Sequence, residues 1–410
     1  MTDNHIFRAL KYRNFRLFFI GQGISIVGTW MQQVAMGWLV YRLTSSPLLL
    51  GVVAFASQIP MFALTPLAGV MSDRLDRRRM IIFTQILSMI QALLLAFLTL
   101  TGAIAVWHII VLGIFLGCIN SFDIPSRQSF IVEMVEKKEN LANAIALNSL
   151  MFNAARLVGP SIAGIIIGIA GEGVCFLLNG ISFIAAIWAL YSMNIRPRKV
   201  HGQDSHILEG LKEGLRYAYA SLPIRFILTL LGVVSLMGMS YVVLMPVFAK
   251  DILKGGPSTF GLMMASAGVG ALFATVYLAP RKNILRIAGM IPVFSSIFAV
   301  GLIAFSLSRA LWLSLLLLAF TGFGIMAHMA SSNIILQTIV DDDKRGRIMS
   351  LYAMAFIGVA PFGSLLTGGL ASRIGATNTL IAGGFLCILA SAIFAKKIPR
   401  MVSMIRPPED

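Results

Sequence analysis

Long apolar runs recur from one end of this chain to the other, separated by short polar segments. A helix needs about 20 apolar residues to cross the hydrocarbon core of a bilayer, and only helices or closed barrels satisfy their backbone groups there. The runs are continuous, without the alternation over about ten residues that is typical of barrel strands. They therefore predict twelve helical spans, at 15–43, 48–71, 80–100, 106–123, 141–170, 174–193, 224–248, 258–279, 285–307, 311–338, 348–370 and 380–395.

The spans fall into two groups of six, around a polar linker. We expect an N-terminal six-helix bundle at 1–193, a cytoplasmic linker at 194–223, and a C-terminal bundle with a short tail at 224–410. An internal repeat supports this division, because Ile131 to Gly164 resembles Ile335 to Gly368. Each segment leaves a span through a valine followed by acidic residues. Parallel repeats of this kind place a transport path between the two halves.

The basic residues predict the orientation, because cytoplasmic loops carry the excess of Lys and Arg. If both termini are cytoplasmic, the cytoplasmic segments hold 27 of the 33 Lys and Arg residues. Arg156 falls inside a span, and the outer loops hold Arg42, Lys250, Lys254, Arg309 and Arg373. The net charge of +16 is thus a topology signal, and we expect no nucleic-acid partner.

Composition indicates the class of protein and the kinds of site to expect. The chain is 58% hydrophobic and 12% charged, with a mean hydropathy of +0.85, which indicates a multi-pass membrane protein. We expect it to lie in the bacterial inner membrane. Cys118, Cys175 and Cys387 are solitary and lie in apolar runs, so we interpret them as packing residues. No P-loop and no cluster of catalytic side chains occurs. We expect no enzyme activity, no cofactor and no metal.

The linker contains a segment, Ile207 to Tyr217, whose apolar residues recur at helical spacing opposite charged ones. This pattern predicts an amphipathic helix. The helix either lies on the membrane surface or serves as a passive tether between the halves.

A specific motif follows the second span, where the chain reads Gly69-Val70-Met71-Ser72-Asp73-Arg74-Leu75-Asp76-Arg77-Arg78-Arg79. It resembles the loop between helices two and three of the major facilitator superfamily, G-x-x-x-D-R-x-G-R-R, with Asp76 in place of the second glycine. The resemblance implies a latch on the cytoplasmic side, whereas the alternative is ordinary positive-inside charge. The expected gate residues are Gly69, Asp73, Arg74, Arg77, Arg78, Asp123 and Arg127.

The fifth span carries Arg156 and then Gly159-Pro160, with Gly164 four residues further on. This resembles the G-P-x-x-G motif associated with exporters and antiporters of the superfamily, with the last glycine displaced by one position. Small residues allow close helix crossing and proline bends a helix, so the motif is expected to seal this span against a partner helix. The alternative is that Gly and Pro are simply common in membrane helices.

Nearly the whole chain resembles one branch of the superfamily, which contains the enterobactin exporters and related secretion or macrolide-efflux proteins. The segments that carry this resemblance are 120–128, 141–148 and Arg345-Gly346-Arg347. It implies an all-α integral membrane protein with the major facilitator fold, twelve helices and both termini in the cytoplasm.

Ionisable residues inside spans are costly in lipid, so they are candidates for function. Asp123 and Arg156 lie at similar depths and could pair, or Asp123 could pair with Arg77 and join the latch. Asp123 is then either a gating residue or a proton carrier. His328 in span ten is the other proton candidate, since histidine titrates near neutral pH; its alternative role is a buried hydrogen bond.

In this superfamily, spans one, four, seven and ten line the central cavity. Their polar or polarisable residues, together with Gln58, predict an amphipathic substrate cavity; each of them could instead hold helices together or fill the core. Span one has no Asp or Glu, which argues against strongly cationic substrates, and Arg156 could balance an anionic one. The cavity candidates are Gln22, Trp30, Gln33, Gln58, Asn120, Tyr241, Met245 and Asn333.

These observations predict a secondary-active transporter that exports a small amphipathic molecule, such as a siderophore, macrolide or other drug, by alternating access. The expected partners are that substrate, the lipid bilayer and a coupling proton, and we expect a monomer. The alternative is an importer or a lysophospholipid flippase of the same fold.

Overall fold

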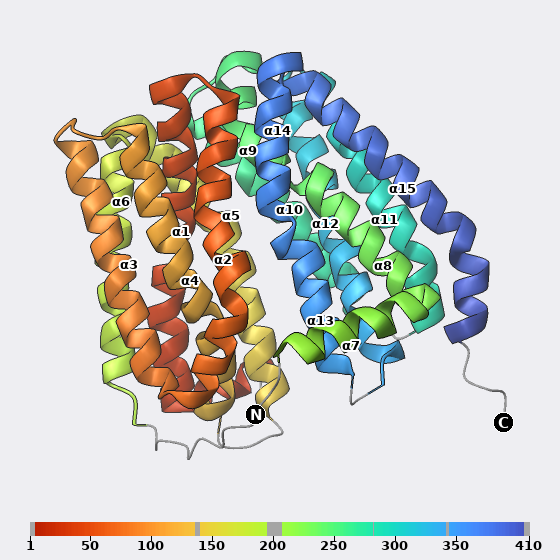
Figure 1. Ribbon diagram of the computed structural model, residues 1–410. Coiled ribbons are helices and arrows are strands. Elements are labelled where there is room, and N and C mark those ends of the chain that lie inside the picture. The colour runs from red at the N-terminus through yellow and green to blue at the C-terminus, as the bar shows by residue number, and fades with distance from the viewer. Residues whose placement is uncertain (1–4, 136–139, 195–206, 282, 342–343, 406–410) are drawn as a thin grey trace. The chain divides into compact units, whose positions relative to one another are not determined.

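The computed structural model describes residues 5–135, 140–194, 207–281, 283–341 and 344–405, and these parts are helical throughout, without strands. Figure 1 shows the helices as ribbons along the chain. In the first half of the sequence they are α1 (Arg13–Thr44), α2 (Pro47–Arg74), α3 (Arg77–Leu100), α4 (Val106–Met134), α5 (Leu141–Ala170) and α6 (Glu172–Tyr191), after a short 3-10 turn at His5–Lys11.

The second half begins with the linker helix α7 (Ile207–Ala220). Two of its long helices contain π-helical segments. The first comprises α8 (Leu222–Val233), η3 (Val234–Met239), α9 (Tyr241–Val247) and η4 (Phe248–Ile252), and the second comprises α13 (Arg345–Ala353), η5 (Met354–Gly358) and α14 (Ala360–Ile374). The remaining helices are α10 (Pro257–Leu278), α11 (Ile284–Leu307), α12 (Leu311–Ile339) and α15 (Ala376–Ile405).

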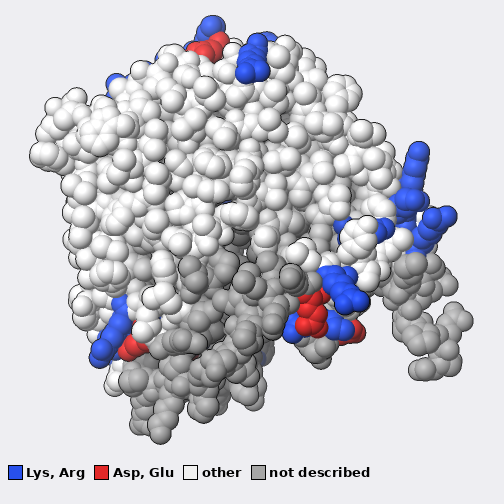
Figure 2. Space-filling model, in the orientation of Figure 1, with Lys and Arg blue, Asp and Glu red and all other residues white. Residues whose placement is uncertain are grey.

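Eleven helical segments in the described residues are long and apolar enough to span a membrane. The predicted first span is α1, a helix of 32 residues that is not among these eleven and that carries Gln22, Gln32 and Gln33. The all-helical membrane fold is thus confirmed, and the twelfth span and the orientation of the termini stay predictions. Figure 2 shows, on one face, a broad surface without charged side chains, with Lys, Arg, Asp and Glu gathered along its margins.

Most predicted boundaries agree with the helices to within a few residues, but two spans continue further than predicted. We predicted the end of the twelfth span at residue 395, whereas α15 continues to Ile405. The fourth span bears on the candidate site. We predicted its end at Asp123, whereas α4 continues to Met134 with Pro125 inside it. Proline is tolerated in membrane helices because neighbouring groups satisfy the freed backbone carbonyl. Asp123 and Arg127 therefore lie on a continuous helix.

The internal repeat corresponds to two similar helix ends. Val135 ends α4 with φ −113° and ψ 109°, and Val340 ends α12 with φ −93° and ψ 134°. Both residues have an extended backbone, which stops the helix at the predicted turn. The acidic residues that follow lie partly outside the described residues.

Contacts divide the chain into two units. The N-terminal unit comprises residues 1–44, 56–203 and 256–262, and the C-terminal unit comprises 45–55, 204–255 and 263–410. The N-terminal unit thus includes the start of α10, and the C-terminal unit includes the start of α2. The predicted linker boundaries stay a prediction.

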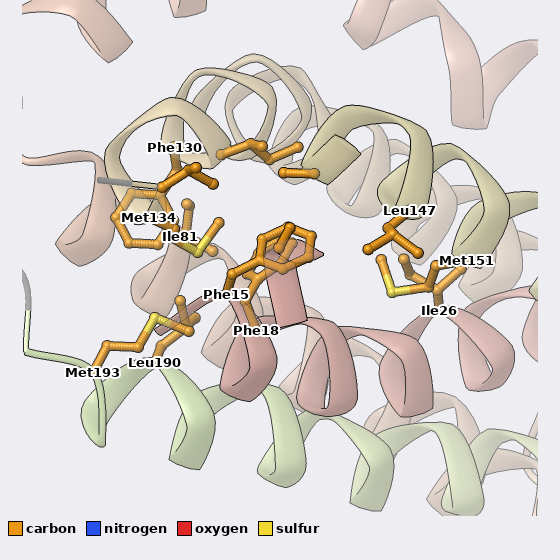
Figure 3. Packing of buried hydrophobic residues seen from close by; sticks show 14 of the residues in the cluster. Phe15, Phe18, Ile26, Ile81, Phe130, Met134, Leu147, Met151, Leu190 and Met193 are labelled. Carbon is orange, nitrogen blue, oxygen red and sulfur yellow. The ribbon is translucent and has the colours of Figure 1, made fainter. Parts of the chain in front are cut away.

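The N-terminal unit has a buried apolar core near the start of α1. In Figure 3, Phe15 and Phe18 lie among side chains from α3, α4 and α6. Both phenylalanines are almost fully buried, at 0% and 1% exposure. Aromatic side chains of this size contribute strongly to packing, so this core fixes the helices that carry the basic motif.

In the C-terminal unit, α11 packs against both α12 and α15. Glycine permits one close approach here, because a Cβ at Gly324 would lie 2.5 Å from the backbone nitrogen of Phe298. The two π-helical segments η3 and η5 are joined by a hydrogen bond from the Ser235 hydroxyl to the Phe356 carbonyl, at 2.5 Å.

Candidate functional site

The basic motif after α2 joins helices within the N-terminal unit. Arg77 forms an ion pair with Glu133 on α4 at 2.7 Å, and both side chains are largely buried. Arg78 donates to the carbonyls of Leu190 and Tyr191 at 2.8 and 2.9 Å, which caps the end of α6. The motif therefore connects α3 to both α4 and α6.

Asp76, which departs from the family pattern, has a defined local role. It is the N-cap of α3, and its carboxylate accepts a hydrogen bond from the Arg79 amide at 3.2 Å. Its φ of −65° lies in the ordinary range, so this turn needs no glycine. The side chains of Gly69, Asp73 and Arg74 lie outside the described residues, and their gate role stays a prediction.

Asp123 is 3% exposed and is held on three sides. Arg127, one turn along α4, pairs with it at 2.7 Å. The Thr84 hydroxyl and the Gln85 amide of α3 donate to its other oxygen at 2.8 and 3.0 Å. Both suggested pairings of Asp123, with Arg156 or with Arg77, were wrong, because Arg127 on the same helix is its ion-pair partner.

A buried polar network along α3 was missed in the sequence analysis. Gln91 on α3 accepts from Gln32 on α1 at 2.9 Å, and Gln32 accepts from Asn179 on α6 at 2.8 Å. The signal was available, since α3 carries polar residues at helical spacing on one face: Thr84, Gln85, Ser88 and Gln91. Buried amides of this kind join three helices inside the unit.

Arg156 is near the middle of α5, as the sixteenth of its 30 residues. Its guanidinium lies over the indole ring of Trp30 on α1, 5.8 Å from the ring centroid. Both side chains are partly exposed. This contact is a cation–π interaction, and no carboxylate pairs with Arg156 among the described residues.

The glycines of the helix-five motif face two different helices. A Cβ at Gly159 would lie 2.5 Å from the Trp30 Cβ and 2.9 Å from the Val27 carbonyl oxygen, so this glycine lets α5 and α1 meet. Gly164 instead faces the start of α10, where a Cβ would lie 3.0 Å from the Ser258 Cα. The Ser258 hydroxyl also donates to the Gly164 carbonyl at 3.1 Å.

His328 lies fully buried on α12 in the C-terminal unit. Neither of its ring nitrogens makes a hydrogen bond of good geometry among the described residues, although the Ile291 backbone lies beside the ring. The hydroxyls of Ser331 and Ser332 likewise have no partner among those residues. The three side chains share one helical face by their spacing. Buried polar groups normally have partners, so this cluster has a capacity for hydrogen bonds that the described protein groups leave unused.

The predicted cavity residues differ in exposure. Gln22, Tyr241 and Met245 are buried inside their own units, at 2%, 2% and 0% exposure. Gln33 is exposed, and the others are partly exposed: Trp30, Gln58, Asn120 and Asn333. Their role in a cavity stays a prediction.

A separate hollow of about 570 Å³ lies between the end of α2, α3 and α4. Apolar side chains such as Phe83, Phe115 and Phe122 dominate its lining, and Asp76 and Arg79 also line it. It contains none of the predicted cavity residues. It is therefore distinct from the predicted substrate cavity.

Comparison with known proteins identifies the family. A model of the transmembrane secretion effectors matches residues 5–407, almost the entire chain. The chain belongs to this family. The transmembrane secretion effectors are transporters of the major facilitator superfamily and not enzymes, so this protein is a membrane transporter, a multi-pass protein of the bacterial inner membrane.

Three similar proteins have described activities. A staphyloferrin A transporter of Staphylococcus aureus is 25% identical over 385 residues, covering 92% of this chain and 95% of that protein. The multidrug efflux pump Tap of Mycolicibacterium fortuitum is 25% identical over 392 residues, 93% of each chain. The enterobactin exporter EntS of Shigella boydii is 24% identical over 373 residues, 90% of this chain and 88% of that one.

Solved structures agree on the fold. A bacterial homologue of the human lysosomal transporter Spinster, in an inward-facing unoccupied conformation, matches with a TM-score of 0.75 and 14% identity, and all of both chains is covered. A bacterial homologue of ferroportin matches with a TM-score of 0.70 and 17% identity, covering 95% of this chain and 99% of that one.

Proposed function

We propose that this transmembrane secretion effector exports a small amphipathic molecule from the cytoplasm by alternating access. The support comes from an enterobactin exporter, a multidrug efflux pump and a staphyloferrin A transporter, each of which aligns with at least nine tenths of this chain. The glycine-proline motif of α5 adds to this, because it brings two helices into close contact with α5. Siderophores, macrolides and other drugs are the substrate classes to test.

We propose a proton as the coupling ion, with His328 as its carrier. The observation behind this choice is that both ring nitrogens are buried without a hydrogen bond of good geometry among the described residues, while Asp123 is already held by Arg127, Thr84 and Gln85. Of the two roles considered for Asp123, gating residue or proton carrier, we therefore assign it the gating role. Because His328 is fully buried here, this proposal requires a conformation of the transport cycle in which its ring can exchange a proton with water.

Uptake into inside-out membrane vesicles tests the direction of transport and its coupling together. The vesicles have an acidic interior and receive a siderophore, a macrolide, a dye or a lysophospholipid. An uncoupler then collapses the proton gradient. Export predicts that one class accumulates inside and leaks out when the gradient collapses. Accumulation that does not depend on the proton gradient would refute proton coupling. Accumulation only in right-side-out vesicles would favour the alternative that the protein is an importer. Movement of the lysophospholipid alone would favour the flippase.

A further inference from the structure

Arg156 is a cation in the middle of a membrane helix without an anionic partner in the described part of the chain. At about 1.5 Å per residue, it lies roughly 20 Å from either end of α5. Ionisable side chains at such a depth are costly and usually pair with an opposite charge. Here the neighbour is an aromatic ring, which leaves the guanidinium N–H groups directed at no carboxylate.

The acidic side chains that the structure describes in this unit have basic partners of their own. Asp123 pairs with Arg127, and Glu133 pairs with Arg77. Glu172 is bound by Arg42 at the opposite end of the unit, with oxygen contacts of 2.7 and 3.2 Å. Since α1 carries no acidic residue, its face beside Arg156 offers no counter-charge.

The local packing holds Arg156 in position. Gly159 is one turn beyond it on α5 and allows α1 to come close enough for Trp30 to lie beneath the guanidinium. An arginine that rests on an aromatic face keeps its planar fork available for a bidentate contact with a carboxylate. Trp30 and Arg156 remain partly exposed, so a ligand can reach them.

Two further polar residues lie close to Trp30 and Arg156 along α1 and α5. Gln33 follows Trp30 by three residues on α1 and is exposed, and Asn153 precedes Arg156 by three residues on α5. Residues three apart share a helix face. The set combines a cation, an aromatic ring and two amides, which suits an amphipathic molecule with an acidic group and an apolar body.

We propose that Arg156 binds the anionic group of the transported substrate and thereby selects carboxylate-bearing amphiphiles over neutral or cationic ones. Trp30 is its positioning residue. This inference rests on the proposed function and specifies its substrate class. The competing explanation is a structural one, in which the Arg156–Trp30 contact only holds α5 against α1.

Ligand binding to the purified protein tests the proposal without requiring transport. The probes are amphipathic carboxylic acids, each paired with its methyl ester, and the readout is the dissociation constant from fluorescence titration. The wild type is expected to bind at least one acid more tightly than its ester. Arg156→Gln should weaken binding of that acid at least tenfold, which corresponds to about 1.4 kcal/mol, and leave binding of the ester unchanged, because only the acid can form a charge-assisted hydrogen bond with the guanidinium.

Two further variants separate binding from folding. Arg156→Lys keeps the charge but loses the planar fork, so we expect intermediate affinity for the acid. Arg225→Gln is the matched control, because Arg225 also lies over an aromatic ring, 5.1 Å from the centroid of Tyr219, but near the start of α8. It should leave acid binding unchanged. A wild type that binds no acid more tightly than its ester, or an Arg156→Gln variant with wild-type acid affinity, overturns the proposal.

Variants of Trp30 are tested by their preference for the acid over its ester, because a purely structural role of Trp30 would not change that preference. Trp30→Phe retains an aromatic face and should retain the preference for acid over ester. Trp30→Ala should lower the acid affinity alone. Equal loss of acid and ester affinity in Trp30→Ala would favour the structural explanation and count against the proposal.

Transport of the same pairs separates this proposal from the proposed function. If vesicles accumulate esters or cationic dyes but no acids, export stands and anion selection fails. If nothing accumulates while Arg156-dependent acid binding persists, the anion site stands and export fails.

Discussion

Asp123 shows how a single buried charge is stabilised in this protein. Its carboxylate has an arginine on its own helix and two donors on α3. The side chains of Asp123 and Arg127 are 5% and 13% exposed, so both are largely removed from solvent. Removing one partner of a buried ion pair leaves the other charge uncompensated.

Asp123→Asn should therefore destabilise the protein by about 3 to 5 kcal/mol, because Arg127 loses its counter-charge. The unfolding temperature of the purified protein measures this effect. Asp123→Asn combined with Arg127→Gln should recover part of the loss, since no charge is then left alone. A single variant as stable as the wild type would contradict this account of Asp123.

Gly159→Ala should destabilise the protein by about 1 to 3 kcal/mol through overpacking, because the new methyl group meets Trp30 and the Val27 carbonyl. Gly168→Ala is the matched control on the same helix, where a Cβ would lie 3.5 Å from the Ser258 hydroxyl, an ordinary contact. The control should unfold at the wild-type temperature or above it. Equal effects of the two substitutions would show that helix propensity, and not packing against α1, decides the result.

At the scale of elements, the linker helix α7 is held by side-chain contacts with its neighbours. α7 contacts the start of α13 through an ion pair between Glu213 and Arg347 at 2.6 Å. The Tyr217 hydroxyl donates to Asp341 at 3.1 Å, and Lys344 lies over the Tyr217 ring. These contacts fix α7 to the C-terminal unit, so it is more than a loose tether.

Glu213→Arg should release α7, because it places two like charges together, and Arg347→Glu should do the same. The ion pair is half-exposed and contributes up to about 1 kcal/mol, so amide hydrogen exchange in α7 should accelerate about fivefold at most. The double variant that exchanges both charges should restore the slower exchange. Unchanged exchange in both single variants would show that this pair does not hold the helix.

Most helix boundaries followed from the sequence to within a few residues, since a long apolar run leaves little alternative in lipid. The partners of the polar residues in these helices did not. Arg77 matched the family pattern, but its pairing with Glu133 depends on α4 continuing past Pro125, which an apolar-run criterion does not show. The contact between Arg156 and Trp30 required the relative rotation of two helices, and a single sequence does not contain that information.

At the scale of the whole molecule, the distribution of basic residues predicts cytoplasmic termini, and labelling of single cysteines tests it. Cys118, Cys175 and Cys387 are first replaced by serine or alanine. Ala103→Cys, in the loop between α3 and α4, should react with an impermeant thiol reagent in intact spheroplasts. Gly346→Cys, at the start of α13, should react only after the membrane is opened. The reverse pattern would invert the topology.

The proposed function requires that this chain alone moves its substrate against a gradient, driven by protons and without nucleotide. Transport by the purified protein in liposomes with an acidic interior, in buffer free of ATP, tests this requirement with the substrate identified in vesicles. We expect accumulation inside the liposomes, abolished by an uncoupler and strongly reduced in His328→Gln. No accumulation with folded wild-type protein, or accumulation that survives the uncoupler, would contradict the proposed function.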